Sequence, residues 1–161
     1  MNAALFWTSW IALACFVAAE FGKRPALVSA RAPAKWTFPV SACGLVLLLI
    51  HMAIGLDIRH DWSHTAAVRD TARQTAAVYG LDWGGGLYVN YVFAGIWALD
   101  VWHGTRAGRA RPLHRRSGLL WALRVFYFTI IFNGAVVFVA GPRRWLGAGL
   151  VLAMVWAWRR R

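Results

Sequence analysis

Residues 36–55, WTFPVSACGLVLLLIHMAIG, form an uninterrupted run without a charged side chain. A helix needs about 20 such residues to cross the hydrocarbon layer of a membrane. The run therefore predicts a membrane-spanning helix. Four further apolar runs flank it, at residues 5–20, 83–102, 119–141 and 145–158.

The composition agrees with a chain embedded in lipid. Of its 161 residues, 60% are hydrophobic, which is more apolar surface than a soluble domain of this size buries. The five runs predict an all-α fold, a polytopic membrane helical bundle with about five transmembrane spans in a single domain, residues 1–161. The last run is short and follows a break at Gly141-Pro142, so it is either a short fifth span or half of a hairpin with the fourth.

The positive charge predicts the orientation. Of a formal net charge of +12, nearly all falls on one side if the N-terminus lies outside and the C-terminus in the cytoplasm. The basic residues form short clusters between apolar runs, which indicates topology and not nucleic-acid binding. We expect a multi-pass protein of the bacterial inner membrane whose partners are the lipid bilayer and other membrane subunits.

The stretch from Asp57 to Asp82 is the only long loop between the runs. It lacks proline and is rich in residues that suit a helix. We expect a short surface helix on the outer side, at about residues 60–79, that ends at Gly80.

The start of this loop holds the densest group of metal-ligand residue types. His60 and His64 are four residues apart, which places them on one face of a helix, and two imidazoles at that spacing suit a divalent transition metal. Asp57 and Asp61 are the candidate carboxylate partners, and His51 adds a further ligand if the chain turns at Gly55. The plainer alternative is a wet surface helix whose histidines and carboxylates pair with nearby arginines.

Haem is a less favoured cofactor. Two axial histidines must lie at one depth on facing helices, whereas His51 and His103 are predicted near opposite membrane surfaces. Ligation by His51 with His60 or His64 stays open.

Several polar side chains are predicted in one layer of the outer leaflet. The members of this polar layer are His51, Tyr88, Asn90, Tyr91 and Asn133. Polar groups within a membrane are costly unless they are paired or face a cavity. The layer is therefore either a network of hydrogen bonds between helices or a site.

An ion pair is predicted near the inner surface. Asp100 lies close to the end of the third run and Arg124 near the start of the fourth, at matching depths. His103 follows Asp100 on the same helix face. We expect these residues to pair helices, with proton relay as the alternative.

The leading hypothesis is an integral inner-membrane protein whose outer face carries a histidine and aspartate site for a metal ion or a proton. The alternative is a non-catalytic accessory or scaffold subunit of a larger membrane complex. No motif in the chain identifies a reaction or a substrate.

Overall fold

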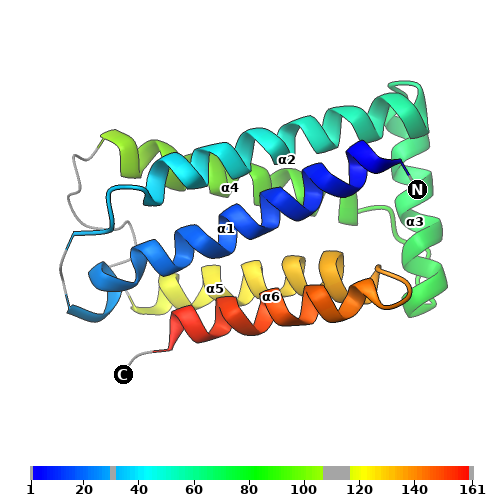
Figure 1. The fold of residues 1–161 in the computed structure, drawn as a ribbon. Coiled ribbons are helices and arrows are strands. Elements are labelled where there is room, and N and C mark those ends of the chain that lie inside the picture. Colours follow the sequence, from blue (N-terminus) through cyan, green and yellow to red (C-terminus); the bar gives the residue numbers. More distant parts are fainter. Residues whose placement is uncertain (1, 30–31, 107–116, 160–161) are drawn as a thin grey trace.

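A computed structural model of the chain describes residues 2–29, 32–106 and 117–159. In these segments the chain forms six α-helices and one short π-helical segment, with no strand, so the predicted all-helical class is confirmed. Five helices run beside one another and the sixth, α3, crosses one end of the bundle (Figure 1). In chain order the elements are α1 (Ala3–Ser29), α2 (Thr37–His60), α3 (His64–Tyr79), α4 (Gly86–Arg106), α5 (Ser117–Phe132), η1 (Asn133–Val137) and α6 (Arg143–Trp158).

Helices α1 and α2 form a tightly packed antiparallel pair. A Cβ atom at Gly44 would lie 2.7 Å from the Cβ of Cys15 and 2.9 Å from the ring of Trp97. Small residues at such points let helix backbones approach closely. Gly44 therefore fixes where α1, α2 and α4 meet.

A sharp corner separates α2 from α3. Asp61 and Trp62 both adopt left-handed backbone conformations, with φ of 46° and 58°, and end α2. Ser63 then caps α3, because its hydroxyl accepts a hydrogen bond from the amide of Ala66 at 3.3 Å. The helix predicted at residues 60–79 therefore starts at His64, and His60 is the last residue of α2.

Helix α5 continues into η1, and a turn then reverses the chain into α6. Gly141 has a φ of 73° and Pro142 follows it, a combination that suits a tight reversal. A Cβ atom at Gly147 would collide with the carbonyl oxygen of Ala135. Close packing of α6 on η1 thus requires glycine at this position.

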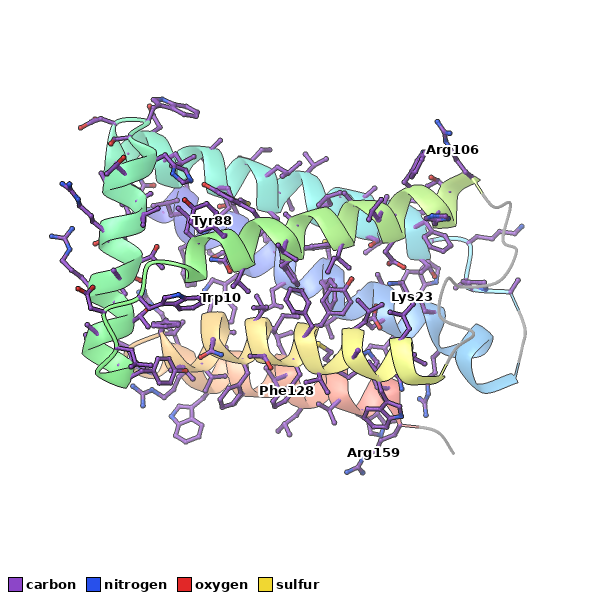
Figure 2. The ribbon with its side chains drawn as sticks, turned by 180° about the vertical axis from the view of Figure 1, so that it is seen from behind. Trp10, Lys23, Tyr88, Arg106, Phe128 and Arg159 are labelled. Atoms are coloured by element: carbon purple, nitrogen blue, oxygen red, sulfur yellow. The ribbon has the colours of Figure 1, made fainter. Side chains whose placement is uncertain are left out.

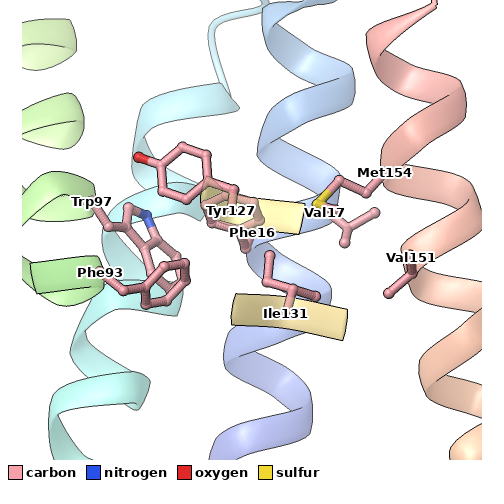
Figure 3. Close-up of a cluster of buried hydrophobic side chains, with 8 residues drawn as sticks. All are labelled: Phe16, Val17, Phe93, Trp97, Tyr127, Ile131, Val151 and Met154. Carbon is pink, nitrogen blue, oxygen red and sulfur yellow. The ribbon is translucent and has the colours of Figure 1, made fainter. Parts of the chain in front are cut away.

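Aromatic side chains form the centre of the core (Figure 3). The ring of Phe16 meets the rings of Trp97 and Tyr127 edge-on, each at 5.0 Å between centroids. The indole of Trp97 donates a hydrogen bond to the hydroxyl of Ser41 at 2.8 Å, which satisfies its buried N–H. The remaining members of the cluster are Val17, Phe93, Ile131, Val151 and Met154.

Among the described residues, three helical stretches are long and apolar enough to cross a membrane. They are Ala3–Arg24, Thr37–His60 and Gly118–Val137. Of the other two predicted spans, residues 145–158 lie in α6 and residues 83–102 lie in α4 except for the first three, and both helices run alongside these stretches (Figure 1).

Candidate binding cavity

A cavity of about 690 Å³, partly open to the outside of the protein, lies at the end of the bundle that α3 crosses. Side chains from all six α-helices and from η1 line it. Its volume falls within the range of about 300–1,000 Å³ that is usual for small-molecule sites. Space of this size distinguishes this end of the bundle from the packed core.

The end of the cavity next to α3 is polar. Asp70, Thr71 and Gln74 of α3 line it together with Asn90 and Tyr91 of α4. The carboxylate of Asp70 accepts a hydrogen bond from the amide of Gln74 at 2.9 Å. Polar groups from two helices therefore meet at this end.

The opposite end of the cavity is apolar. Its floor is formed by residues of the core cluster, among them Phe16, Phe93 and Trp97 (Figure 3). On α2 the lining extends from His60 down to Leu48, which corresponds to roughly 18 Å along the helix axis. The cavity thus has a polar head region and an apolar tail region, a pattern that suits an amphipathic molecule.

His51 lies between these two regions. Its Nδ1 is 3.0 Å from the carbonyl oxygen of Leu5 and 3.2 Å from the hydroxyl of Thr8. Both contacts join α2 to the start of α1 and fix the orientation of the imidazole. The ring also lines the cavity.

Helix α3 is attached at its far end to η1. The hydroxyl of Tyr79 donates a hydrogen bond to the side-chain oxygen of Asn133. The amide of Asn133 in turn donates to the carbonyl of Thr129 at 2.8 Å. Single π-helical turns within α-helices often occur at functional sites, and here the turn holds the residue that anchors α3.

The residues predicted to bind a metal ion do not converge. His60 ends α2 and lies 4.0 Å from Asp70, whereas His64 begins α3 and packs on Tyr88 and Tyr91. The prediction assumed that His60 and His64 lie on the same helix, where a four-residue spacing brings two side chains together. The left-handed corner at Asp61 and Trp62 places them on different helices instead.

The other predicted ligands are also apart. Asp57 accepts a hydrogen bond from the indole of Trp62 at 2.8 Å, and Asp61 sits in the corner itself. Helix α2 passes Gly55 without turning, so His51 faces α1. Among the described residues, no group of three or more His, Cys, Asp or Glu side chains could hold a metal ion.

The structure distributes the predicted polar layer over two sites. His51, Asn90 and Tyr91 line the cavity. Asn133 anchors α3 through Tyr79, and Tyr88 is exposed beside His64. The layer is thus partly a contact between helices and partly the wall of a cavity.

A buried ionic cluster occupies the opposite end of the bundle, where Figure 2 labels Lys23. The ammonium of Lys23 donates to Glu20 at 2.7 Å and to Asp100 at 2.5 Å. The indole of Trp158 donates to the second oxygen of Glu20 at 2.7 Å. The cluster therefore joins α1, α4 and α6.

The predicted partners of Asp100 lie near this cluster in different ways. Arg124 is buried, and its guanidinium lies over the ring of Trp158 at 5.6 Å. His103 is exposed and packs edge-on against Trp102. Lys23 is the partner that sequence reasoning missed, although its position three residues after Glu20 placed it on the same helix face.

Sequence reasoning also missed the α3 side of the cavity. Asp70, Thr71 and Gln74 share one side of α3 because Gln74 follows Asp70 by four residues and Thr71 by three. That spacing was visible, but their importance depends on α3 crossing the bundle end, which local sequence does not reveal.

Comparison with known proteins gives no relative. No family model matches the chain, and no curated protein or solved structure is significantly similar to it.

Proposed function

We propose that this chain is a multi-pass protein of the bacterial inner membrane whose cavity beneath α3 binds a small amphipathic molecule. The observation that carries the proposal is the polarity of the cavity. Polar side chains gather under α3 and aromatic side chains form the floor. A ligand with a polar head and an apolar body satisfies both regions at once.

The outer surface of the bundle supports insertion into a membrane. Large apolar side chains at the middle of several helices are exposed, for example Ile50 of α2, Val125 of α5 and Leu152 of α6. Such surfaces are unfavourable in water and favourable against lipid. All five lengthwise helices contribute to this surface, which favours five crossings.

Helices α5 and α6 have 16 residues each, but α5 continues into η1, so the crossing formed by α6 is the shortest of the five. Its 16 residues extend over roughly 24 Å, slightly less than the hydrocarbon layer of about 30 Å. Arginines at its ends, Arg143, Arg144 and Arg159, can reach the headgroups and make up the difference.

The charge distribution favours placing α3 outside the cell. Lys23, Arg106 and Arg159 lie at the end of the bundle that is far from α3 (Figure 2). In the sequence, further basic residues follow Arg106, within the segment 107–116, and Arg159, at positions 160 and 161, and these positions lie outside the described residues. On the basis of the positive-inside rule, we propose that this end lies in the cytoplasm and the N-terminus outside.

In this orientation the cavity lies within the outer half of the membrane. Its polar end faces the extracytoplasmic surface, where the headgroup of a lipid-soluble molecule resides. The proposed function is therefore capture of an amphipathic molecule from the outer leaflet, with α3 covering its head.

Binding of 4-heptylphenol to the purified protein, measured by native mass spectrometry, tests the proposal. We expect one equivalent to bind saturably. Gly55 lines the cavity, and a Cβ atom there would have only the flexible end of Leu5 nearby, at 3.9 Å. The substitution Gly55→Phe should fill the space and abolish binding.

The matched control is Gly95→Phe on α4. Gly95 is exposed, is not part of the cavity lining, and an added Cβ would have no atom within 4 Å. This variant should bind as the unmodified protein does. Absence of saturable binding, or equal binding by the two variants, would contradict the proposal and favour a non-catalytic accessory or scaffold subunit in which the polar residues only hold α3 in place.

A further inference from the structure

The hydrogen bonds of His51 determine which of its ring nitrogens carries the proton. The carbonyl of Leu5 can only accept a hydrogen bond, so Nδ1 must donate to it. The hydroxyl of Thr8 gives its own hydrogen to the carbonyl of Ala4 at 2.7 Å, so it too accepts from Nδ1. The Nδ1 position therefore holds the hydrogen.

The imidazole is neutral in this arrangement. None of the ion pairs between described residues includes His51. An imidazolium without a carboxylate partner is costly in an apolar bundle. With the hydrogen on Nδ1, the lone pair of a neutral ring is on Nε2.

Nε2 has no hydrogen-bond partner among the described residues, and its ring borders the cavity. Asn90 and Tyr91 line the same region, and neither side chain has a hydrogen bond within the described part of the chain. Asn90 is exposed, and His51 and Tyr91 are half-buried, so all three side chains are accessible to a ligand or to water in the cavity. The cavity therefore offers a ligand one hydrogen-bond acceptor from His51, and both donors and acceptors from Asn90 and Tyr91 of α4.

We infer that the cavity selects a neutral amphiphile with a hydroxyl head, and that this hydroxyl donates a hydrogen bond to Nε2 of His51. The inference rests on the proposed function. The ligand class comprises alkylated phenols and long-chain alcohols, because both combine a hydroxyl with an apolar body that suits the floor at Phe93 and Trp97. His51 is the specificity-determining residue.

Other head groups fit this region less well. An ionised carboxylate or a fully ionised phosphate monoester has no hydrogen to donate to Nε2, so it leaves this nitrogen unpaired even though Arg59 and Arg143 also line the cavity. A head that only accepts hydrogen bonds, such as an ether or a ketone, leaves Nε2 unpaired. The hydroxyl is the simplest group that gives Nε2 its missing donor.

The experiment compares 4-heptylphenol with its methyl ether, 4-heptylanisole, by native mass spectrometry. The two probes share an apolar body, and the ether carries a methyl group in place of the hydrogen that the hydroxyl can donate. One hydrogen bond to the ring corresponds to an affinity ratio of about fivefold in favour of the phenol. A third probe, 1-decanol, shows whether the cavity prefers a phenolic or an aliphatic hydroxyl as the hydrogen-bond donor to Nε2.

Two variants test whether His51 causes the preference for the phenol over the ether. His51→Leu should bind the phenol and the ether about equally, because Leu offers no acceptor. His51→Gln keeps an acceptor oxygen and an amide hydrogen and should retain part of the preference. Thermal unfolding of both variants identifies any loss of binding that results from misfolding.

Equal affinity of the unmodified protein for the phenol and the ether would overturn the inference, even if both bind saturably and the proposed function stands. A preference for the phenol that persists in a folded His51→Leu protein would overturn the role of His51. Failure of all three probes to bind would instead overturn the proposed function itself. The comparison within the unmodified protein does not depend on any variant folding.

Discussion

Removal of the Lys23 ammonium should strongly destabilise the bundle. Lys23 bridges Glu20 and Asp100, and the side chains of the three residues are 13%, 9% and 15% exposed. The substitution Lys23→Met keeps the apolar stem and leaves two carboxylates without their shared cation. Charge-assisted hydrogen bonds contribute about 1.5–3 kcal/mol each, so the loss of two predicts a cost of about 3–6 kcal/mol. Breaking a buried ion pair by removing one partner costs a similar amount, about 3–5 kcal/mol.

The free energy of unfolding can be measured by titration with sodium dodecyl sulfate in mixed micelles, followed by helical circular dichroism. The control is Lys35→Met, because Lys35 is exposed and has no ion pair among the described residues. That variant should lie within about 0.5 kcal/mol of the unmodified protein.

Neutralising the whole cluster separates the cost of unpaired charge from the loss of the lysine itself. The triple variant Glu20→Gln, Lys23→Met and Asp100→Asn leaves no buried charge among these positions. It should recover a large part of the stability that Lys23→Met alone loses. A cost below about 1 kcal/mol for Lys23→Met, or no recovery in the triple variant, would refute the reasoning.

Three further outcomes follow from the fold. Gly147→Ala should destabilise the protein by about 1–3 kcal/mol, because the added Cβ collides with the backbone of η1, whereas Gly149→Ala on the same helix has open space and should be neutral or stabilising. Thermal unfolding of the two variants distinguishes them, and equal effects would contradict the packing. Tyr79→Phe removes the hydrogen bond between α3 and η1, so amide exchange in α3 should accelerate while α5 is unchanged; unaltered exchange would show that this bond does not anchor α3. The orientation can be tested in whole cells with a protein whose two native cysteines are replaced by serine. A membrane-impermeant maleimide should label Arg73→Cys on α3 and should not label Lys35→Cys at the other end of the bundle. The reverse labelling pattern would show that the proposed orientation is inverted.

The sequence predicted the helical character of the chain well because the signals are local. Apolar runs such as residues 36–55 and 119–141 became parts of α2 and of α5 with η1. Gly80 does end a helix, with a φ of 71°, as expected of a glycine after a helical stretch. Each of these features depends on neighbours within a few residues along the chain.

The candidate site was predictable only in part, because it depends on how distant segments meet. The positions of His51 and Asn90 along their predicted spans placed both side chains at the same depth in the membrane, and in the structure both line the cavity. The metal hypothesis failed to gain support because it needed His60 and His64 on one helix. The corner at Asp61 depends on a left-handed conformation of two non-glycine residues, which propensity alone does not predict.

The contribution of α3 was beyond sequence reasoning for the same reason. Its helix-compatible composition without proline indicated a surface helix, but nothing local specified the cavity between it and the bundle. The anchor between Tyr79 and Asn133 joins residues 54 positions apart. Such contacts become visible only when the helices have been placed in space.

Photocrosslinking tests the central claim most directly. A 4-alkylphenol with a diazirine in its alkyl chain would be bound to the protein in lipid nanodiscs, irradiated, and mapped by peptide mass spectrometry. We predict adducts on cavity residues of α2 and α4, such as Met52 and Phe93, that excess 4-heptylphenol suppresses and that Gly55→Phe, but not Gly95→Phe, abolishes. Adducts confined to lipid-facing residues such as Val125 and Leu152, unaffected by competitor or by either variant, would contradict a ligand-binding cavity.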